Sequence, residues 1–219
     1  MNNLFWIIMK IFIPLTESTI FRYPSSLTPS VRVPNEQELQ ARMIVSAYNL
    51  FHEIGDIVFV IDPTFKFARR LDNIFGPYKR KVNISYSPNI IQDDYSSLLK
   101  EFVNITDEVI FVTNLKQFVE NNTGKLKEII NDLKQYDAGV ISFNATDATT
   151  LFINSSNNIV NAIDSNTNTT AASLGIYYWK SSTDLAIAIE NNTSQNKTFA
   201  AIINQYTEKE KIVGVRPIY

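Results

Sequence analysis

Continuous apolar runs and segments of helical periodicity alternate along the chain from residue 10 to residue 143. The runs KIFIPL (10–15), DIVFVID (56–62) and EVIFVT (108–113) are typical of strands in a sheet that is covered on both faces. The clearest helix is predicted over 123–136, where the apolar positions follow the i, i+3, i+4, i+7 spacing of one helix face: Leu126, Ile129, Ile130 and Leu133. The pattern therefore predicts strand–helix units.

The complete pattern predicts the following order of elements. Strands are expected over 10–15, 56–62, 81–86, 108–113, 138–143, 149–154, 157–163, 172–180 and 211–219. Helices are expected over 33–55, 63–75, 93–104, 123–136, 183–190 and 197–206. Strand–helix units followed by a stretch rich in strands indicate an α/β sandwich of three layers. We predict a mostly parallel central sheet, a β-rich C-terminal part and a single domain over 1–219.

Charge and residue types narrow the possible functions. The chain has 20 Lys and Arg against 22 Asp and Glu, a net charge of −2, so broad binding of nucleic acid through its phosphates is disfavoured. The basic stretch at 65–81 is interpreted as a solvated helix face and turn. The absence of cysteine excludes disulfides and thiolate chemistry, and the single histidine, His52, is interpreted as a cation at a helix end.

The apolar segment 4–15 is interrupted by Lys10 and contains Pro14, so it is too short to span a bilayer. It lacks the charged start of a signal peptide, and we interpret it as a buried first strand, with Met9 as an alternative start. Sequons such as Asn104-Ile105-Thr106 are expected by chance in a chain this rich in Asn, Ser and Thr. We expect no secretion, and a location in the cytoplasm or, because the Asn- and Ile-rich usage resembles that of AT-rich viral genomes, in a virion.

Glycines and cations are both placed unfavourably for a standard phosphate site. A phosphate-binding loop needs glycine because its backbone approaches anionic oxygens closely. None of the six glycines lies in the first 54 residues, and the turn after the first strand, LTESTIFR (15–22), contains Glu17. Between Lys134 and Lys180 there is no Lys or Arg, and a second histidine for a catalytic triad is missing. Neither a P-loop nor a Ser–His nucleophile is indicated.

Several strings, taken in order, resemble the sugar-phosphate nucleotidyltransferase family over residues 9–216. They are MKIFIPL (9–15), TNLKQFVE (113–120), LKEIINDLKQYDAGVISF (126–143), AASLGIYYWKS (171–181) and NKTFAAIINQYTEKEKIVGV (196–215). The fourth of them resembles the family's Ala-x-x-Gly-Ile-Tyr-Tyr-Phe-Lys strand. The resemblance implies a Rossmann-like domain of the kind on which these enzymes join a nucleoside triphosphate to a sugar phosphate.

The positions that depart from the family pattern are those that bind Mg²⁺ and phosphate in the family. Lys116 stands where the family has its Mg²⁺-binding Asp, and the glycine-rich first loop is replaced by TESTIFR (16–22). Three further family features correspond to other residue types here: the Lys of a Thr-Pro-Lys-Pro stretch to Ser30 within Thr28-Pro29-Ser30-Val31, a Glu-Lys pair to Asp164-Ser165, and an acid to Thr198. Because Mg²⁺ offsets the charge of the triphosphate during transfer, these departures remove the expected sources of transition-state stabilisation.

The resemblance implies a ligand cleft at the carboxyl ends of the strands, where α/β proteins bind ligands. The predicted binding residues are Thr16, Glu17, Arg22, Asn114, Lys116, Gln117, Gly175 and Tyr177. No catalytic residue, metal ligand or cofactor is predicted, and Mg²⁺ is not expected because Lys116 replaces the Asp. The expected partners are a nucleotide or sugar ligand, a second copy of the chain, or a partner protein.

Three hypotheses for the function follow. The leading one is a catalytically degenerate nucleotidyltransferase-like protein that keeps a ligand cleft or acts as a partner subunit. The second is an active nucleotidyltransferase, or a transferase that uses a nucleotide sugar, in which Lys116 supplies the positive charge of the metal. The third is a structural or assembly protein on the same fold. Pyrophosphate release, nucleotide binding with and without EDTA, and the mass in solution separate these hypotheses.

Overall fold

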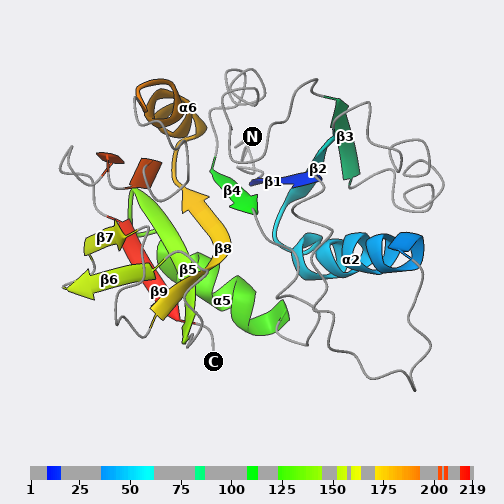
Figure 1. The fold of residues 1–219 in the computed structure, drawn as a ribbon, viewed down its shortest axis with the longest axis horizontal. Coiled ribbons are helices and arrows are strands. Elements are labelled where there is room, and N and C mark those ends of the chain that lie inside the picture. The colour runs from blue at the N-terminus through cyan, green and yellow to red at the C-terminus, as the bar shows by residue number, and fades with distance from the viewer. Residues whose placement is uncertain are drawn as a thin grey trace, which may run out of the picture.

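The computed structural model describes residues 9–15, 36–61, 82–86, 108–112, 123–144, 152–156, 159–163, 171–192, 202–203, 205–206 and 213–217. Figure 1 shows how their helices and strands are arranged. The strands are β1 (Lys10–Leu15), β2 (Asp56–Ile61), β3 (Val82–Tyr86), β4 (Val109–Val112), β5 (Ala138–Asn144), β6 (Phe152–Ser156), β7 (Ile159–Ile163), β8 (Ala171–Trp179) and β9 (Val213–Pro217). The helices are α2 (Glu36–Phe51), α5 (Thr123–Leu133) and α6 (Ser182–Glu190), and residues 202–203 and 205–206 are also helical.

All the described strands belong to one sheet. Its main path has the order β3-β2-β1-β4-β8-β5-β9, and the hairpin of β6 and β7 joins it through β8. Strands β3, β2, β1 and β4 pair in parallel, and so do β5 and β9. Strand β8 lies between β4 and β5 and is antiparallel to both. Within the described residues, β8 is thus the one reversed strand of the main path.

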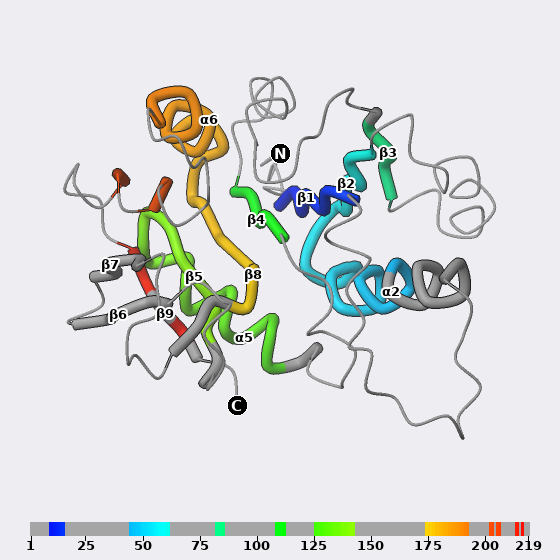
Figure 2. Tube along the Cα trace, viewed as in Figure 1, coloured from blue at the N-terminus to red at the C-terminus, as the bar shows by residue number. Residues whose placement is uncertain are grey.

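Helices cover both faces of this sheet. Buried residues of α2 and α5, such as Ala47 and Leu126, form one core cluster with the strands, and residues of α6 and of 202–206 form a second one. In Figure 2 the tube of the sheet accordingly passes between α6 on one side and α2 and α5 on the other. Within β4, Ile110 and Val112 belong to the first cluster and Phe111 to the second. This alternation explains why the strand is apolar at every position.

The predicted fold class is confirmed. The mostly parallel sheet, the helices on both faces and the strand-rich C-terminal part all agree with the three-layer α/β prediction. The first strand is buried after Lys10, as expected from its apolar run. The helices predicted over 63–75 and 93–104 lie outside the described residues, and the prediction of a single domain stays a prediction. No helix within the described ranges is both long and apolar enough to cross a membrane.

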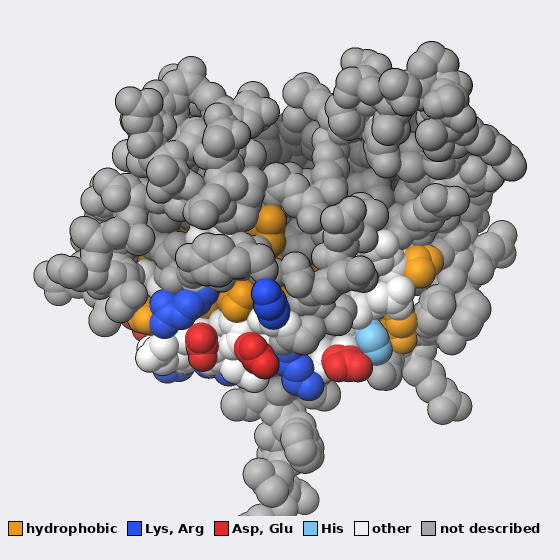
Figure 3. Space-filling view, turned by 90° about the horizontal axis from the view of Figure 1, so that it is seen from below, with side chains coloured by type: hydrophobic (Ala, Val, Ile, Leu, Met, Phe, Trp, Pro, Cys, Tyr) orange, Lys and Arg blue, Asp and Glu red, His pale blue; other side chains and the backbone are white. Residues whose placement is uncertain are grey.

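Acidic and basic groups are interspersed on the surface of α5. Its exposed side chains include Lys125, Lys127, Glu128 and Asp132. Figure 3 views the molecule from below, and red and blue side chains neighbour one another on the described part of that face. The described part of this face therefore carries no extended patch of a single charge, in keeping with the near-neutral balance of the sequence.

Candidate functional site

The carboxyl edge of the sheet is the edge at which β1, β2 and β4 end, at Leu15, Ile61 and Val112. Parallel strands expose their ends together at such an edge, and ligands of open α/β sheets bind there. Strands β1 and β4 are direct neighbours, with Phe12 paired to Phe111, so their ends lie side by side. The last residue of β4, Val112, pairs with Ile176 of β8. The residues that precede Ile176 in β8 therefore extend past the end of β4.

A bulge interrupts β8 at this point. Ile141 of β5 pairs with Ile176, but the next residue of β5, Ser142, pairs with Ser173. Two residues of β8, Leu174 and Gly175, are thus inserted relative to β5. Gly175 has a φ of 79°, in the left-handed region that favours glycine because a Cβ atom would clash with the backbone there. The bulge therefore requires glycine where β8 passes the end of β4.

Two of the eight predicted binding residues fall within the described residues. Gly175 lies where β8 passes the end of β4, and its assignment to a ligand site stays a prediction. Tyr177 is 3% exposed, pairs with Phe111 and Val140, and belongs to the core cluster on the α6 face. Tyr177 is therefore a core residue of the sheet in this structure.

The remaining six predicted residues lie outside the described residues. They are Thr16, Glu17, Arg22, Asn114, Lys116 and Gln117. In the sequence Thr16 directly follows β1, and Asn114 is the second residue after β4. The assignment of these six residues to a ligand site stays a prediction.

At the opposite edge, where the parallel strands begin, the structure reveals a polar cluster that the sequence did not suggest. The hydroxyl of Tyr178 donates a hydrogen bond to Glu108 Oε1 at 3.1 Å. Lys134 Nζ lies 2.8 Å from Glu108 Oε2, and the backbone N–H of Lys10 donates to the carbonyl oxygen of Glu108 at 3.1 Å. Burial, the charge of Glu108 and the hydrogen bond to it, in that order, raise the pKa of Tyr178 above its usual range.

The three side chains of this cluster are 70 and 26 residues apart in sequence, counted from Glu108 to Tyr178 and to Lys134. No local motif links them, because they come from the start of β4, from β8 and from the residue after α5. A single acid directly before an apolar strand was the only signal available. On the other face of the sheet, Tyr206 forms a similar bond, donating to Asp184 Oδ2 at 3.1 Å. Burial and then the charge of Asp184 raise the pKa of Tyr206.

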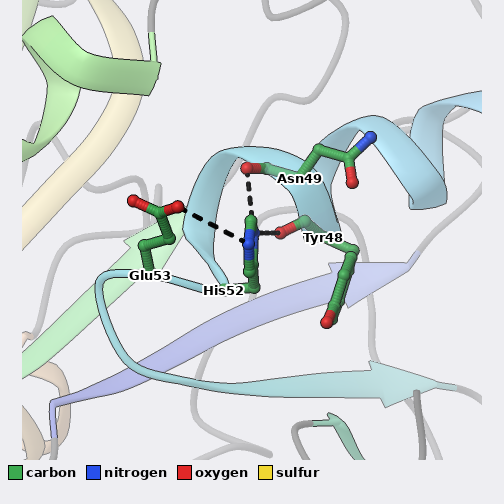
Figure 4. A network of polar contacts seen from close by, with 4 residues as sticks. All are labelled: Tyr48, Asn49, His52 and Glu53. Carbon is green, nitrogen blue, oxygen red and sulfur yellow. Dashed lines mark hydrogen bonds and ion pairs between the residues drawn. The ribbon is translucent and has the colours of Figure 1, made fainter.

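His52 lies directly after the last residue of α2 (Figure 4). Its Nδ1 is 3.0 Å from the carbonyl oxygen of Tyr48 and 3.1 Å from that of Asn49. Because both partners are acceptors, Nδ1 carries a proton and donates to the end of the helix. The ring also stacks on Tyr48, with 5.0 Å between centroids, and Nε2 lies 3.9 Å from Glu53. These contacts confirm the position of His52 at the helix end, and its interpretation as a cation stays a prediction.

Solved structures that share this arrangement over nearly the whole chain include several nucleotidyltransferases. The nucleoside-diphosphate-sugar pyrophosphorylase from Vibrio cholerae RC9 has a TM-score of 0.63 and 12% identity, over 96% of this chain and 92% of that one. The putative glucose-1-phosphate thymidylyltransferase from Bacillus anthracis has a TM-score of 0.60 and 16% identity, over 97% of this chain and 87% of that one. The inositol-1-phosphate CTP transferase from T. maritima has a TM-score of 0.63 and 8% identity, over 96% of this chain and 85% of that one. No protein-family model and no curated protein matches the sequence.

The chain has a nucleotidyltransferase fold. The resemblance found in the sequence is thereby confirmed for the arrangement of strands and helices. At 8% to 16% identity, the likeness does not extend to particular residues of a site.

The electrostatics of this nucleotidyltransferase fold can be described for part of the chain. Within the described ranges, no group of three or more His, Asp or Glu residues could hold a metal ion. Lys116, on which the expectation about Mg²⁺ depends, lies outside those ranges, so this expectation stays a prediction. The expected homo-oligomer or partner protein and the expected location also stay predictions.

Proposed function

We propose that this protein binds a nucleotide or a nucleotide sugar at the carboxyl edge of its sheet and does not catalyse nucleotidyl transfer. The shared fold supports the location, because ligands of such sheets bind outside the carboxyl ends of the strands. The observation that carries the proposal is the lysine at 116, four residues after the end of β4. The family resemblance places an Asp that holds Mg²⁺ at this position.

Replacing a metal-binding carboxylate by an ammonium group changes what the position can do. An Asp binds Mg²⁺, which orients the phosphates for in-line attack and neutralises the developing charge. Lysine offers one positive charge without a coordination geometry, so it can hold a phosphate but cannot orient two reacting groups. Loss of one such stabilising group typically costs about 3–4 kcal/mol of transition-state stabilisation. We therefore expect the protein to bind the ligand and not to transfer a nucleotidyl group.

The first loop supports the same separation. The segment 16–22 contains no glycine, so it lacks the residue type that lets backbone N–H groups approach a triphosphate. Glu17 in this segment adds a negative charge that opposes a triphosphate. At the neighbouring strand end, Gly175 keeps a position without a side chain beside β4. We expect a ligand with fewer phosphate charges, such as a nucleotide sugar, to bind more tightly than a free triphosphate.

Two measurements on the wild-type protein test the proposal. The protein is mixed with CTP, UTP or dTTP, a sugar 1-phosphate and Mg²⁺, and pyrophosphate is followed by a coupled assay. The same nucleotides and UDP-glucose are titrated by calorimetry with and without EDTA. We expect no protein-dependent pyrophosphate and binding that EDTA leaves unchanged. Pyrophosphate release would overturn the proposal in favour of an active transferase, and the absence of any binding would overturn it as well.

Restoring the acid gives a sharper test. In Lys116→Asp, nucleotide binding should become Mg²⁺-dependent, because a carboxylate is a preferred Mg²⁺ ligand and its charge repels phosphates in the absence of metal. We expect affinity without Mg²⁺ to fall by about tenfold, the effect of one lost charge-assisted contact. Lys127→Asp makes the same charge change on the exposed face of α5 and serves as the control. Equal behaviour of the two variants would contradict the assignment of Lys116 to the site.

A further inference from the structure

The cluster of Glu108, Tyr178 and Lys134 connects four parts of the fold. Glu108 precedes β4 and Lys134 follows α5, whereas Tyr178 lies within β8. The backbone carbonyl of Glu108 also accepts a hydrogen bond from β1 through the N–H of Lys10. Tyr178 is 1% exposed and the Glu108 side chain is 17% exposed, so the bond between them is shielded from water. Hydrogen bonds to a charged group are directional and stronger than neutral ones.

A directional contact is useful here because the pairing of β4 with β8 is short. The two strands pair over four positions, from Val109 with Trp179 to Val112 with Ile176. All four residues of β4 are buried and apolar. The short backbone ladder sets the register of the two strands, and the apolar contacts around it add no direction of their own. On the other side of β8, the pairing with β5 is interrupted by the bulge.

The bulge lies directly next to this short pairing along β8. Tyr178 pairs with Ile110, and two positions further along Ile176 pairs with Val112, after which β8 leaves β4 and reaches Gly175. An extended strand rises by about 3.3 Å per residue, so Gly175 lies about 10 Å from Tyr178 along β8. Tyr178 and the bulge therefore belong to one short, continuous stretch of β8.

We propose that the Glu108–Tyr178–Lys134 cluster is a positioning device that holds the β8 bulge in place beside the end of β4. Tyr178 and Glu108 act through Gly175 and are positioning residues. The consequence for ligand binding rests on the proposed function, but the position of the bulge is a property of the protein alone. Part of the test therefore needs no ligand.

Tyr206 provides a matched control for the cluster. Its hydroxyl donates to a carboxylate at the same distance of 3.1 Å, but Asp184 belongs to α6 and not to the sheet. Tyr206 contacts β8 through the ring of Trp179, at 6.2 Å between centroids. Substitution by Phe keeps this ring contact and removes only the hydroxyl. Tyr178→Phe and Tyr206→Phe thus remove the same kind of bond on opposite faces of the sheet, one of them anchored in β8.

Hydrogen exchange followed by mass spectrometry is the first experiment. Peptides that cover 171–179 and 56–61 are compared in wild type, Tyr178→Phe and Tyr206→Phe. We expect Tyr178→Phe to accelerate exchange at Leu174–Ile176 by about tenfold relative to β2, the effect of one lost hydrogen bond to a charged group. Tyr206→Phe should leave this ratio unchanged. Equal acceleration throughout the sheet, or the same ratio in both variants, would overturn the proposal.

Two substitutions of Glu108 separate the hydrogen bond from the charge. Glu108→Gln keeps an oxygen that accepts from Tyr178, so it should preserve slow exchange at the bulge. Glu108→Leu removes the acceptor and should accelerate exchange as Tyr178→Phe does. Acceleration of equal size in both variants would show that the hydrogen bond is not the positioning element.

Calorimetric titration with UDP-glucose adds the functional readout. If the wild type binds, Tyr178→Phe should weaken the affinity by about the same tenfold factor, whereas Tyr206→Phe should not change it. Unchanged affinity in Tyr178→Phe would overturn the link to the site. If the wild type binds neither nucleotide nor nucleotide sugar, the proposed function fails, while the exchange data still decide whether the cluster positions the bulge.

Discussion

The two edges of the sheet are built in different ways. At the amino edge, where the parallel strands begin, side chains of opposite charge meet across neighbouring elements, as in the pair of Lys10 Nζ and Asp56 Oδ2 at 2.8 Å. The backbone also packs tightly there, because Gly55 lies against the carbonyl group of Met9. At the carboxyl edge, the described residues show instead a bulge at Leu174 and Gly175, with Gly175 in a left-handed conformation.

This difference suggests that the amino edge mainly stabilises the fold and that the carboxyl edge mainly serves ligand binding. The contacts at the amino edge join neighbouring elements of the fold and are made by groups that satisfy one another, so they stabilise the fold. The irregular backbone at the carboxyl edge contributes little to such pairing, and backbone of this kind is common at functional sites. We therefore expect the largest loss in the free energy of unfolding from the closely packed backbone of the amino edge. A smaller loss is expected from the bulge at the carboxyl edge, where substitutions should also change ligand binding.

The largest effect is expected from Gly55→Ala at the amino edge. A Cβ atom at this position would lie 2.2 Å from the carbonyl oxygen of Met9, a backbone atom that accepts the hydrogen bond of Asp56 N–H. The strands must then separate, and we expect a loss of about 3 kcal/mol in the free energy of unfolding, the upper end for an overpacked site. Urea denaturation followed by circular dichroism measures it. Asn49→Ala, at an exposed position of α2, is the control, and a loss of the same small size in both variants would refute the tight packing.

Alkaline pH should reduce the contribution of Tyr178 and Tyr206 to the stability of the fold. The pKa values of Tyr178 and Tyr206 are raised in the folded protein, so unfolding at high pH releases protons that the fold retains. Their contribution is complete below the pKa of an unfolded tyrosine, about 10, and declines as the pH rises above it. Each tyrosine should lower the free energy of unfolding by about 1.4 kcal/mol per pH unit in that range.

Substitution identifies the tyrosine contribution to this decline. In Tyr178→Phe one titrating group is missing, so the stability of the variant should fall less steeply between pH 10 and pH 11 than that of the wild type. All lysines are present in both proteins, so their own titration largely cancels in the difference. Urea denaturation at pH 8, 9, 10 and 11 provides the measurement. A difference between wild type and variant that stays constant over this range would contradict the prediction.

A smaller effect is expected from Gly175→Ala at the carboxyl edge. The φ of 79° is unfavourable for a residue with a Cβ atom, by about 1–2 kcal/mol. Gly175→Asn should cost less, because asparagine enters the left-handed region more readily than other non-glycine residues. Urea denaturation ranks the variants, and we expect the order wild type, Asn, Ala. Equal losses for the two variants would show that the added side-chain volume and not the backbone conformation determines the cost.

The sequence predicts most of the described fold because burial leaves a clear pattern in it. The run Val109–Val112 is buried on both faces, which removes the alternation of polar residues and leaves a continuous apolar run. In α5, Leu126, Ile130 and Leu133 are buried at helical spacing, as predicted. The insertion of β8 between β4 and β5 is not visible in such patterns, because pairing over a long sequence separation depends on the whole sheet. The sequence patterns therefore do not predict this insertion.

Less of the candidate site than of the fold can be predicted from the sequence. Gly175 could be expected at a bulge, because an isolated glycine within an apolar strand often marks one. The resemblance places Tyr177 in the ligand cleft by its motif position, but the structure buries this side chain in the core on the α6 face, because a motif position alone does not fix the direction of a side chain. Tyr178 and Glu108 carry no local signal, since their contact depends on the register of two strands.

The smallest effect is expected for the exposed ion pair at the amino edge. The side chains of Lys10 and Asp56 are 26% and 36% exposed, and pairs of this kind contribute about 0.2–1 kcal/mol. Lys10→Met should therefore lower the free energy of unfolding by less than about 1 kcal/mol. Lys134→Met should cost more, because the partner Glu108 is the less exposed carboxylate, at 17%, and would remain as a shielded charge held by Tyr178 alone among the contacts described here.

Salt separates these two lysines. In 1 M NaCl the Debye length falls to about 3 Å, close to the 2.8 Å between Lys10 Nζ and Asp56 Oδ2, so salt should reduce the contribution of this exposed pair. The stability of Lys10→Met should then move toward that of the wild type. The loss in Lys134→Met should persist, because salt does not restore the hydration that burial removes from Glu108. Urea denaturation in 0.1 M and 1 M NaCl compares the two. If both losses vanish in high salt, the amino edge is held by surface charge alone, and its contrast with the carboxyl edge reduces to the packing at Gly55.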